Sequence, residues 1–211
     1  MRILLINPNS SESMCPVILE AARRAAGAGT ELSVTYVKES PALINSDKDE
    51  LEAAFWTMQK AKSEAGKADA LVIACHSDPG IAAIAEATGL PVVGIGYASM
   101  SAASESRGPV AVLVISEKSA PRKVRLAKRY GLDFDFDCVA TGYTEEMAPE
   151  EVTELLLEKC REALKRRPYS AFVLGCAGMS SAAPSLRVRL PGVEIIDGTE
   201  EAVRILEERY L

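Results

Sequence analysis

One short phrase occurs twice in the chain, and it constrains the fold more than any other feature. The first copy is Ala70-Leu71-Val72-Ile73-Ala74-Cys75, and the second is Ala171-Phe172-Val173-Leu174-Gly175-Cys176. An uninterrupted apolar run of this length is typical of a strand covered on both faces, as in parallel sheets. Each run ends in a cysteine. We therefore predict two cysteines at the carboxyl edges of parallel sheets, where α/β proteins bind their ligands.

Strand and helix patterns alternate along the 211 residues. Strands are expected at 3–6, 31–37, 70–74 and 91–95, and again at 110–115, 134–139, 171–174 and 193–196, with helices between most of them. Two runs of four β units, aligned cysteine to cysteine, indicate an internal duplication. The alternation predicts an α/β fold of two pseudo-symmetric, doubly wound lobes. Each lobe would hold a mainly parallel four-stranded sheet, and the active site would lie in the cleft between them.

The final helix is expected to cross back and cover the first lobe. This prediction divides the chain into a first lobe made of residues 1–97 plus 198–211 and a second lobe made of residues 98–197.

Local signals mark the starts of several helices. Asp78 is the expected N-cap of the helix that begins near Ile81, and Thr199 that of the final helix. Both cysteines are thus expected beside helix N-termini, which would lower the pKa of a thiol. The helix over 118–130 is expected to carry its basic residues on a solvated face: Arg122, Lys123, Arg125, Lys128 and Arg129.

Composition excludes several classes of function. A net charge of −6 argues against nucleic-acid and anionic-membrane partners. No apolar segment approaches the ~20 residues of a membrane span, and the apolar N-terminal stretch is too short for a signal peptide. Five cysteines, an odd number, fit a reducing cytoplasm. With one histidine and no Cys-x-x-Cys, we expect no metal site.

Two thiols that face one small molecule can invert a carbon centre without a cofactor. One takes a proton from one face of the carbon, and the other returns a proton to the opposite face. Cysteine suits both roles because its ordinary pKa, about 8.5, lies near the operating pH. Cys75 and Cys176 are the expected pair, and the loop residues after them would stabilise the enolate: His76, Ser77, Ala177 and Gly178. The other cysteines are expected to be small hydrophobes: Cys15, Cys138 and Cys160.

Four segments together resemble the hydantoin and allantoin racemases of the aspartate/glutamate racemase superfamily. They are Arg2–Ser11, Cys75–Gly80, Pro91–Gly96 and Val173–Met179. The resemblance implies a two-base mechanism without a cofactor, a cyclic ureide as substrate and a homo-oligomer. It assigns the acid/base roles to Cys75 and Cys176. It also implies that a polar loop lines the cleft through Asn7, Asn9 and Ser10.

Three departures from the family pattern leave the substrate open. His76 stands where these racemases more often carry an aromatic or other uncharged residue, Asn45 replaces an expected acid, and the Ser116–Ser119 loop is unusually charged. His76 could touch the substrate, tune Cys75 or simply bond to backbone. One alternative is an amino-acid racemase, although the Asn-Thr and Thr-His pairs that usually follow the two cysteines are replaced here by His76-Ser77 and Ala177-Gly178. Another is a maleate-type isomerase, although neither cysteine loop carries an arginine for a carboxylate. A non-catalytic small-molecule binding protein is the third interpretation.

Overall fold

A computed structural model of the chain describes residues 1–210. The first half runs through β1 (Arg2–Asn7), α1 (Cys15–Ala25), β2 (Glu31–Tyr36), α2 (Asp47–Glu64), β3 (Ala70–Ile73), α3 (Ile81–Thr88), β4 (Val92–Gly94) and α4 (Ile95–Ser104). The second half runs through β5 (Val110–Val114), α5 (Ala120–Arg129), β6 (Phe136–Ala140), α6 (Pro149–Arg166), β7 (Ala171–Leu174), α7 (Ala183–Arg189), β8 (Glu194–Asp197) and α8 (Gly198–Tyr210). Short 3-10 turns lie at Glu12–Met14, Ala65–Lys67, Glu117–Ser119 and Ala177–Ala182, the last labelled η4.

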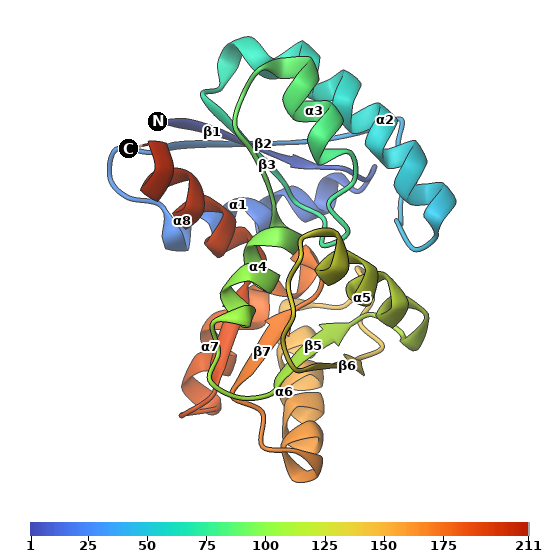
Figure 1. Ribbon diagram of the computed structural model, residues 1–211, viewed down its shortest axis with the longest axis vertical. Helices are drawn as coiled ribbons and strands as arrows, with labels where there is room; N and C mark the ends of the chain where they lie inside the picture. The colour runs from blue at the N-terminus through green and yellow to red at the C-terminus, as the bar shows by residue number, and fades with distance from the viewer. Residues whose placement is uncertain (211) are drawn as a thin grey trace.

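The two halves build the same sheet. The strand orders are β2-β1-β3-β4 and β6-β5-β7-β8, and every pair of neighbours is parallel. The order of the second sheet is therefore that of the first, element for element. This confirms the predicted fold class and makes β3 and β7 equivalent strands (Figure 1).

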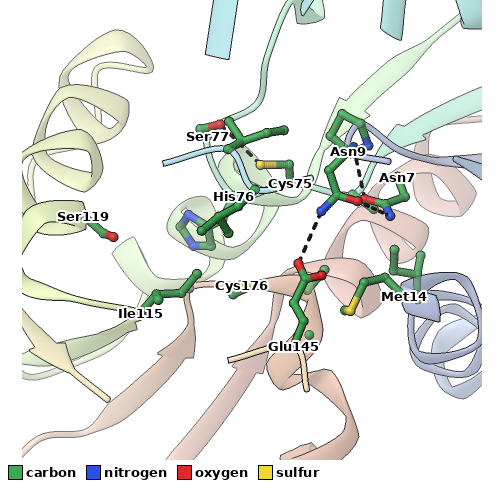
Figure 2. Close-up of a pocket in the computed structure, with 18 of the residues that line it drawn as sticks. Asn7, Asn9, Met14, Cys75, His76, Ser77, Ile115, Ser119, Glu145 and Cys176 are labelled. Carbon is green, nitrogen blue, oxygen red and sulfur yellow. Dashed lines mark hydrogen bonds between the residues drawn. The ribbon is translucent and has the colours of Figure 1, made fainter. Parts of the chain in front are cut away.

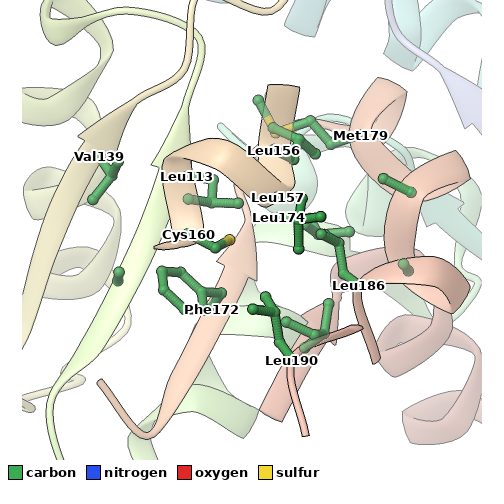
Figure 3. Packing of buried hydrophobic residues seen from close by; sticks show 14 of the residues in the cluster. Leu113, Val139, Leu156, Leu157, Cys160, Phe172, Leu174, Met179, Leu186 and Leu190 are labelled. Carbon is green, nitrogen blue, oxygen red and sulfur yellow. The ribbon is translucent and has the colours of Figure 1, made fainter. Parts of the chain in front are cut away.

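The cysteine strands are central because their side chains are apolar on both faces. All four residues of β3 and all four of β7 are buried. In the second half, Phe172 and Leu174 of β7 pack against Leu156 and Cys160 of α6 (Figure 3). Cys160 is completely buried in this cluster, in agreement with its predicted role as a small hydrophobe.

The last helix returns to the first half, as predicted. Helix α8 lies against α1 and α4 (Figure 1). Its N-terminus is held by Asp197 Oδ1, which accepts a hydrogen bond from the Thr199 N–H at 2.9 Å. The prediction of Thr199 as the N-cap was wrong, because its own hydroxyl is buried without a partner.

One helix, α4, is missing from the prediction. It contains glycine, alanine and serine at many positions, and its buried residues include Gly96, Ala98, Ser99 and Met100. Small residues allow α4 to pack closely between the two halves. Because so many of its residues are small, its sequence shows neither a helical nor a strand periodicity. The predicted boundary between residues 97 and 98 falls inside this helix. We propose that the chain divides into these two lobes and that α4 connects them. Leu211, the last residue of the predicted first lobe, lies outside the described residues.

Candidate active site

The carboxyl ends of the central strands of both sheets open into one cavity. From the first half come the residues that follow β1 and β3, and from the second half those that follow β5 and β7 (Figure 2). Its walls are formed by Asn7, Pro8, Asn9, Met14, Ile18, Leu43, Ile44, Ala74, Cys75, His76, Ser77, Ile115, Ser119, Arg122, Lys123, Glu145, Gly175, Cys176, Ala177 and Gly178. The cavity volume is about 70 Å³, which suits a small compound.

Both predicted cysteines line this cavity. Cys75 follows β3, and its sulfur lies 3.3 Å from Ser77 Oγ. Cys176 follows β7 at the start of η4. They occupy equivalent positions in the two sheets. The described chain thus carries one thiol from each half at a single cavity.

The expected direction of the thiol pKa shift was wrong. Removal from water raises the pKa of Cys75, although a hydrogen bond from Ser77 works in the opposite direction. Burial likewise raises the pKa of Cys176 to about 11, against the effects of the Gly178 N–H and of Lys123. Burial disfavours a charged thiolate, and here it outweighs the nearby backbone donors.

The polar loop after β1 is braced by its own side chains. Asn7 is buried, and its Nδ2 donates to Asn9 Oδ1 at 2.6 Å and to the Ser11 carbonyl at 2.8 Å. Asn9 Nδ2 donates to Glu145 Oε1 of the second half at 3.4 Å (Figure 2). Asn7 and Asn9 line the cavity, whereas Ser10 is not among the residues of its wall.

His76 is a buried, neutral imidazole. It is 2 % exposed, and burial lowers its pKa well below the ordinary range. Its Nε2 lies 3.0 Å from Ser99 Oγ, while Nδ1 is buried without a partner. Because the Ser99 hydroxyl also lies 2.8 Å from the Ile95 carbonyl, its single proton is best placed on that bond. Nε2–H then donates to Ser99, and Nδ1 is left as a buried acceptor without a partner.

Asp78 caps a helix, but not the one that was predicted. Helix α3 begins after Gly80 without a side-chain cap. The Asp78 carboxylate instead accepts from the N–H groups of Gly96 and Tyr97, at 2.8 and 2.6 Å, in the first turn of α4. It also accepts from the Tyr130 hydroxyl at 2.9 Å. The Cys75 loop is thereby tied to α4 and to the second half.

This capping carboxyl predicts a pH-dependent stability. Burial raises the pKa of Asp78 to about 6 in the folded chain. The folded state therefore binds the proton more tightly than the unfolded state. The contribution of Asp78 to the free energy of unfolding is complete below about pH 4. It falls by about 3 kcal/mol as the pH rises through 6.

Chemical denaturation between pH 4 and pH 7 measures this effect. Asp78→Asn keeps an oxygen acceptor and tolerates the positive φ of 52° at this position. Between pH 4 and pH 7, the free energy of unfolding of this variant is expected to lack the decrease that Asp78 causes in the natural chain. Equal pH slopes for the variant and the natural chain would contradict the assignment.

Lys123 lies where the sequence analysis did not place it. Arg125, Lys128 and Arg129 are exposed, but Lys123 is 7 % exposed and lines the cavity. Its Nζ donates to the Gly175 carbonyl at 3.0 Å. The spacing of Lys123 with the buried Leu126 carries the missing signal, since residues three apart share one face of a helix.

Comparison with known proteins identifies the family. The model of the Asp/Glu/hydantoin racemases matches residues 3–206. The chain belongs to this family. A hydantoin racemase of Paenarthrobacter aurescens is 32 % identical over 98 % of this chain and 90 % of its own length. The enzyme is therefore an isomerase of the racemase type, as predicted.

Two solved structures share the fold over nearly the whole chain. The allantoin racemase from Klebsiella pneumoniae superposes with a TM-score of 0.87 at 29 % identity, covering 99 % of this chain and 86 % of that one. The allantoin racemase from Pseudomonas fluorescens superposes with a TM-score of 0.84 at 25 % identity, covering 99 % and 90 %. Both support the arrangement of two parallel four-stranded sheets.

Two further observations concern partners. Within residues 1–210, none of the helices combines the length and the apolar character of a membrane-spanning segment. The same residues contain no group of three or more His, Cys, Asp or Glu side chains arranged to hold a metal ion.

Proposed function

We propose that the enzyme racemises a cyclic ureide, a 5-substituted hydantoin or allantoin, by proton transfer between Cys75 and Cys176. One observation carries the proposal: a thiol from each half lines the same small cavity, at equivalent strand ends. The substrate class is supported by relatives named hydantoin racemase and allantoin racemase. We further propose that the enzyme is cytoplasmic and works as a homo-oligomer without a cofactor.

The reaction needs one thiolate and one thiol. The thiolate takes the proton from the ring carbon, whose carbanion is stabilised by the adjacent carbonyl as an enolate. The second thiol then protonates the opposite face. Because both thiol pKa values are raised by burial, only a small fraction of the free enzyme carries the thiolate near neutral pH. We therefore expect the rate to rise with pH.

The substrate-binding residues are drawn from both halves. We propose that Asn9, Ser77 and the backbone of Ala177 and Gly178 contact the polar edge of the ring, since all four line the cavity. Asn7 holds the loop through its hydrogen bonds. The structure offers no support for a contact from Ser10.

His76 is proposed to accept a hydrogen bond from a ring N–H of the substrate. Its buried Nδ1 has no partner in the chain, and an unpaired buried acceptor is costly. His76→Phe is expected to raise KM by about tenfold, with a smaller effect on kcat. His76→Asn, which keeps an acceptor near the same position, is expected to stay closer to the natural enzyme. An unchanged KM in both variants would remove His76 from the substrate contacts.

The test of the proposed function is polarimetry with the purified enzyme. Each enantiomer of allantoin and of several 5-alkyl hydantoins should lose optical rotation faster than in an enzyme-free control. Retained rotation across the whole panel would contradict the cyclic ureide assignment.

A second class of substrate is favoured by one observation. Arg122 and Lys123 bring cationic groups to the cavity from α5, although neither cysteine loop contains an arginine. Aspartate, glutamate and maleate therefore belong in the same panel. Turnover of a diacid or an amino acid, without turnover of a ureide, would favour the amino-acid racemase or maleate-type isomerase.

A further inference from the structure

The position of Lys123 is unusual for a lysine. It sits on α5, yet its ammonium group reaches the carboxyl end of β7 and donates to the carbonyl of Gly175, the residue before Cys176. It is 7 % exposed and shares the cavity wall with both cysteines. The side chain is therefore removed from water at the place where the proposed proton transfer occurs.

No carboxylate in the described chain forms an ion pair with this ammonium group. Among residues 1–210, no Asp or Glu oxygen lies within ion-pair distance, 4.0 Å, of Lys123 Nζ. One of its three N–H groups is used by Gly175, and no other acceptor in the described chain takes the remaining two. A buried ammonium without a counter-charge is costly, so a site that keeps one is expected to supply an anion.

The groups around Lys123 that can become negative are mainly sulfurs. Burial lowers its pKa, while its interactions with three cysteines raise it. Cys75 and Cys176 line the cavity together with Lys123. The third cysteine, Cys138 on β6, does not line the cavity. The titratable and charged groups that interact with Lys123 are Cys75, His76, Asp78, Arg122, Cys138 and Cys176.

Arg122 does not compete for the same role. Its guanidinium donates to the carbonyl of Asn45 and lies 3.5 Å from Ser119 Oγ. It is also less buried than Lys123. Of the two cations at the cavity, Lys123 is the more buried, and its one hydrogen bond goes to the carbonyl beside Cys176.

We propose that Lys123 is the counter-ion of the single negative charge that the two cysteines pass between them. This inference rests on the proposed function. A thiolate takes the proton from the ring carbon, and the C–H electron pair forms a double bond to the carbonyl carbon while the charge moves to the oxygen. When the carbon takes a proton from the second thiol, the charge arrives on that sulfur. Lys123 keeps its three protons throughout, so one positive charge balances one negative charge at every stage.

The reactivity of the two thiols tests the proposed role of Lys123 as a counter-ion, which acts on the reaction through the cysteines. Alkylation of Cys75 and Cys176 by iodoacetamide, followed peptide by peptide with mass spectrometry, reports the thiolate fraction at each pH. Lys123→Met is expected to move the midpoint of alkylation upward by at least ~1 pH unit, because an opposite charge nearby is lost. We also expect kcat/KM to fall by about 10²-fold. Lys123→Arg retains the charge and is expected to restore the midpoint.

Lys128→Met is the matched control. Lys128 is exposed on the same helix, so its removal is expected to leave both the midpoint and the rate unchanged. Circular dichroism and the Tm of each variant exclude a folding defect. An unchanged alkylation midpoint in a folded Lys123→Met enzyme would overturn the inference.

Alkylation needs no substrate, so the two proposals can fail separately. If the natural enzyme racemises no ureide, the proposed function fails while the midpoint still tests the counter-ion. If it racemises a ureide and Lys123→Met loses activity only on hydantoins that carry a carboxylate, Lys123 binds the substrate side chain, and the counter-ion assignment is wrong.

Discussion

Replacing either Cys75 or Cys176 with serine is expected to reduce racemisation by about 10³-fold or more. Acid/base groups at a reacting carbon typically contribute two to four orders of magnitude. Serine keeps the size of the side chain but has a far higher pKa, so it neither takes nor returns the proton efficiently. Because each thiol serves one face of the carbon, the loss of one blocks inversion in both directions. Initial rates with both enantiomers measure the effect.

Cys15→Ser provides the control for this pair. Cys15 is half-buried at the start of α1 and does not line the cavity. The variant is expected to retain the natural rate. A Cys75→Ser or Cys176→Ser enzyme that stays within tenfold of the natural rate would exclude that cysteine as an acid/base residue.

Gly175→Ala is expected to have the second-largest effect, on both stability and rate. A Cβ at Gly175 would lie far inside van der Waals contact with the Leu113 carbonyl oxygen. That oxygen accepts the Gly175 N–H at 2.9 Å, so β5 and β7 are held together at this point. Neither strand has room to retreat, because Leu113 and Leu174 are buried. We expect a loss of about 3 kcal/mol in the free energy of unfolding.

The rate is expected to fall further than the folded fraction. Gly175 precedes Cys176 and accepts the hydrogen bond of Lys123, so a shifted backbone displaces both groups. A displacement of ~1 Å at a reacting group costs about 10²-fold. Urea denaturation gives the stability, and the rate per folded molecule gives the second effect. Gly66→Ala is the control, since a Cβ at Gly66 meets nothing within 4 Å. Natural stability and rate in Gly175→Ala would contradict the packing argument.

The fold was predictable because its information is local. Apolar runs such as Ala70–Ile73 and Ala171–Leu174 have the length and composition of buried strands, and helix periodicity fills the gaps between them. Equivalent phrases then predicted equivalent positions. The structure indeed places Cys75 and Cys176 at matching strand ends beside one cavity.

The features that were missed depend on contacts between distant parts of the chain. Asp78 has the sequence context of a cap for α3, but its carboxylate reaches the backbone of Gly96 and Tyr97 in α4. The local sequence therefore identifies Asp78 as a capping residue but does not show that it caps α4. Helix α4 was missed for a related reason. Its small residues are explained only by close packing between the two halves, which the local sequence does not show.

The electrostatics of the site were the least predictable. A helix N-terminus predicts a lowered thiol pKa, but the degree of burial depends on how two lobes close around the sulfur. Lys123 belonged to a basic stretch that is otherwise exposed, and only its burial beside Gly175 distinguishes it. The charges in a sequence do not show which side chain is buried without an opposite charge in contact with it.

Deuterium incorporation tests the two-thiol mechanism most directly. The enzyme is supplied with one enantiomer of its ureide substrate in deuterated buffer, and both enantiomers are recovered early in the reaction. Transfer between Cys75 and Cys176 predicts one deuterium at the ring carbon of the inverted product and almost none in the recovered substrate, since the proton arrives from the second thiol. Product that retains the original proton would show that a single group removes and returns it, and would contradict the two-thiol account.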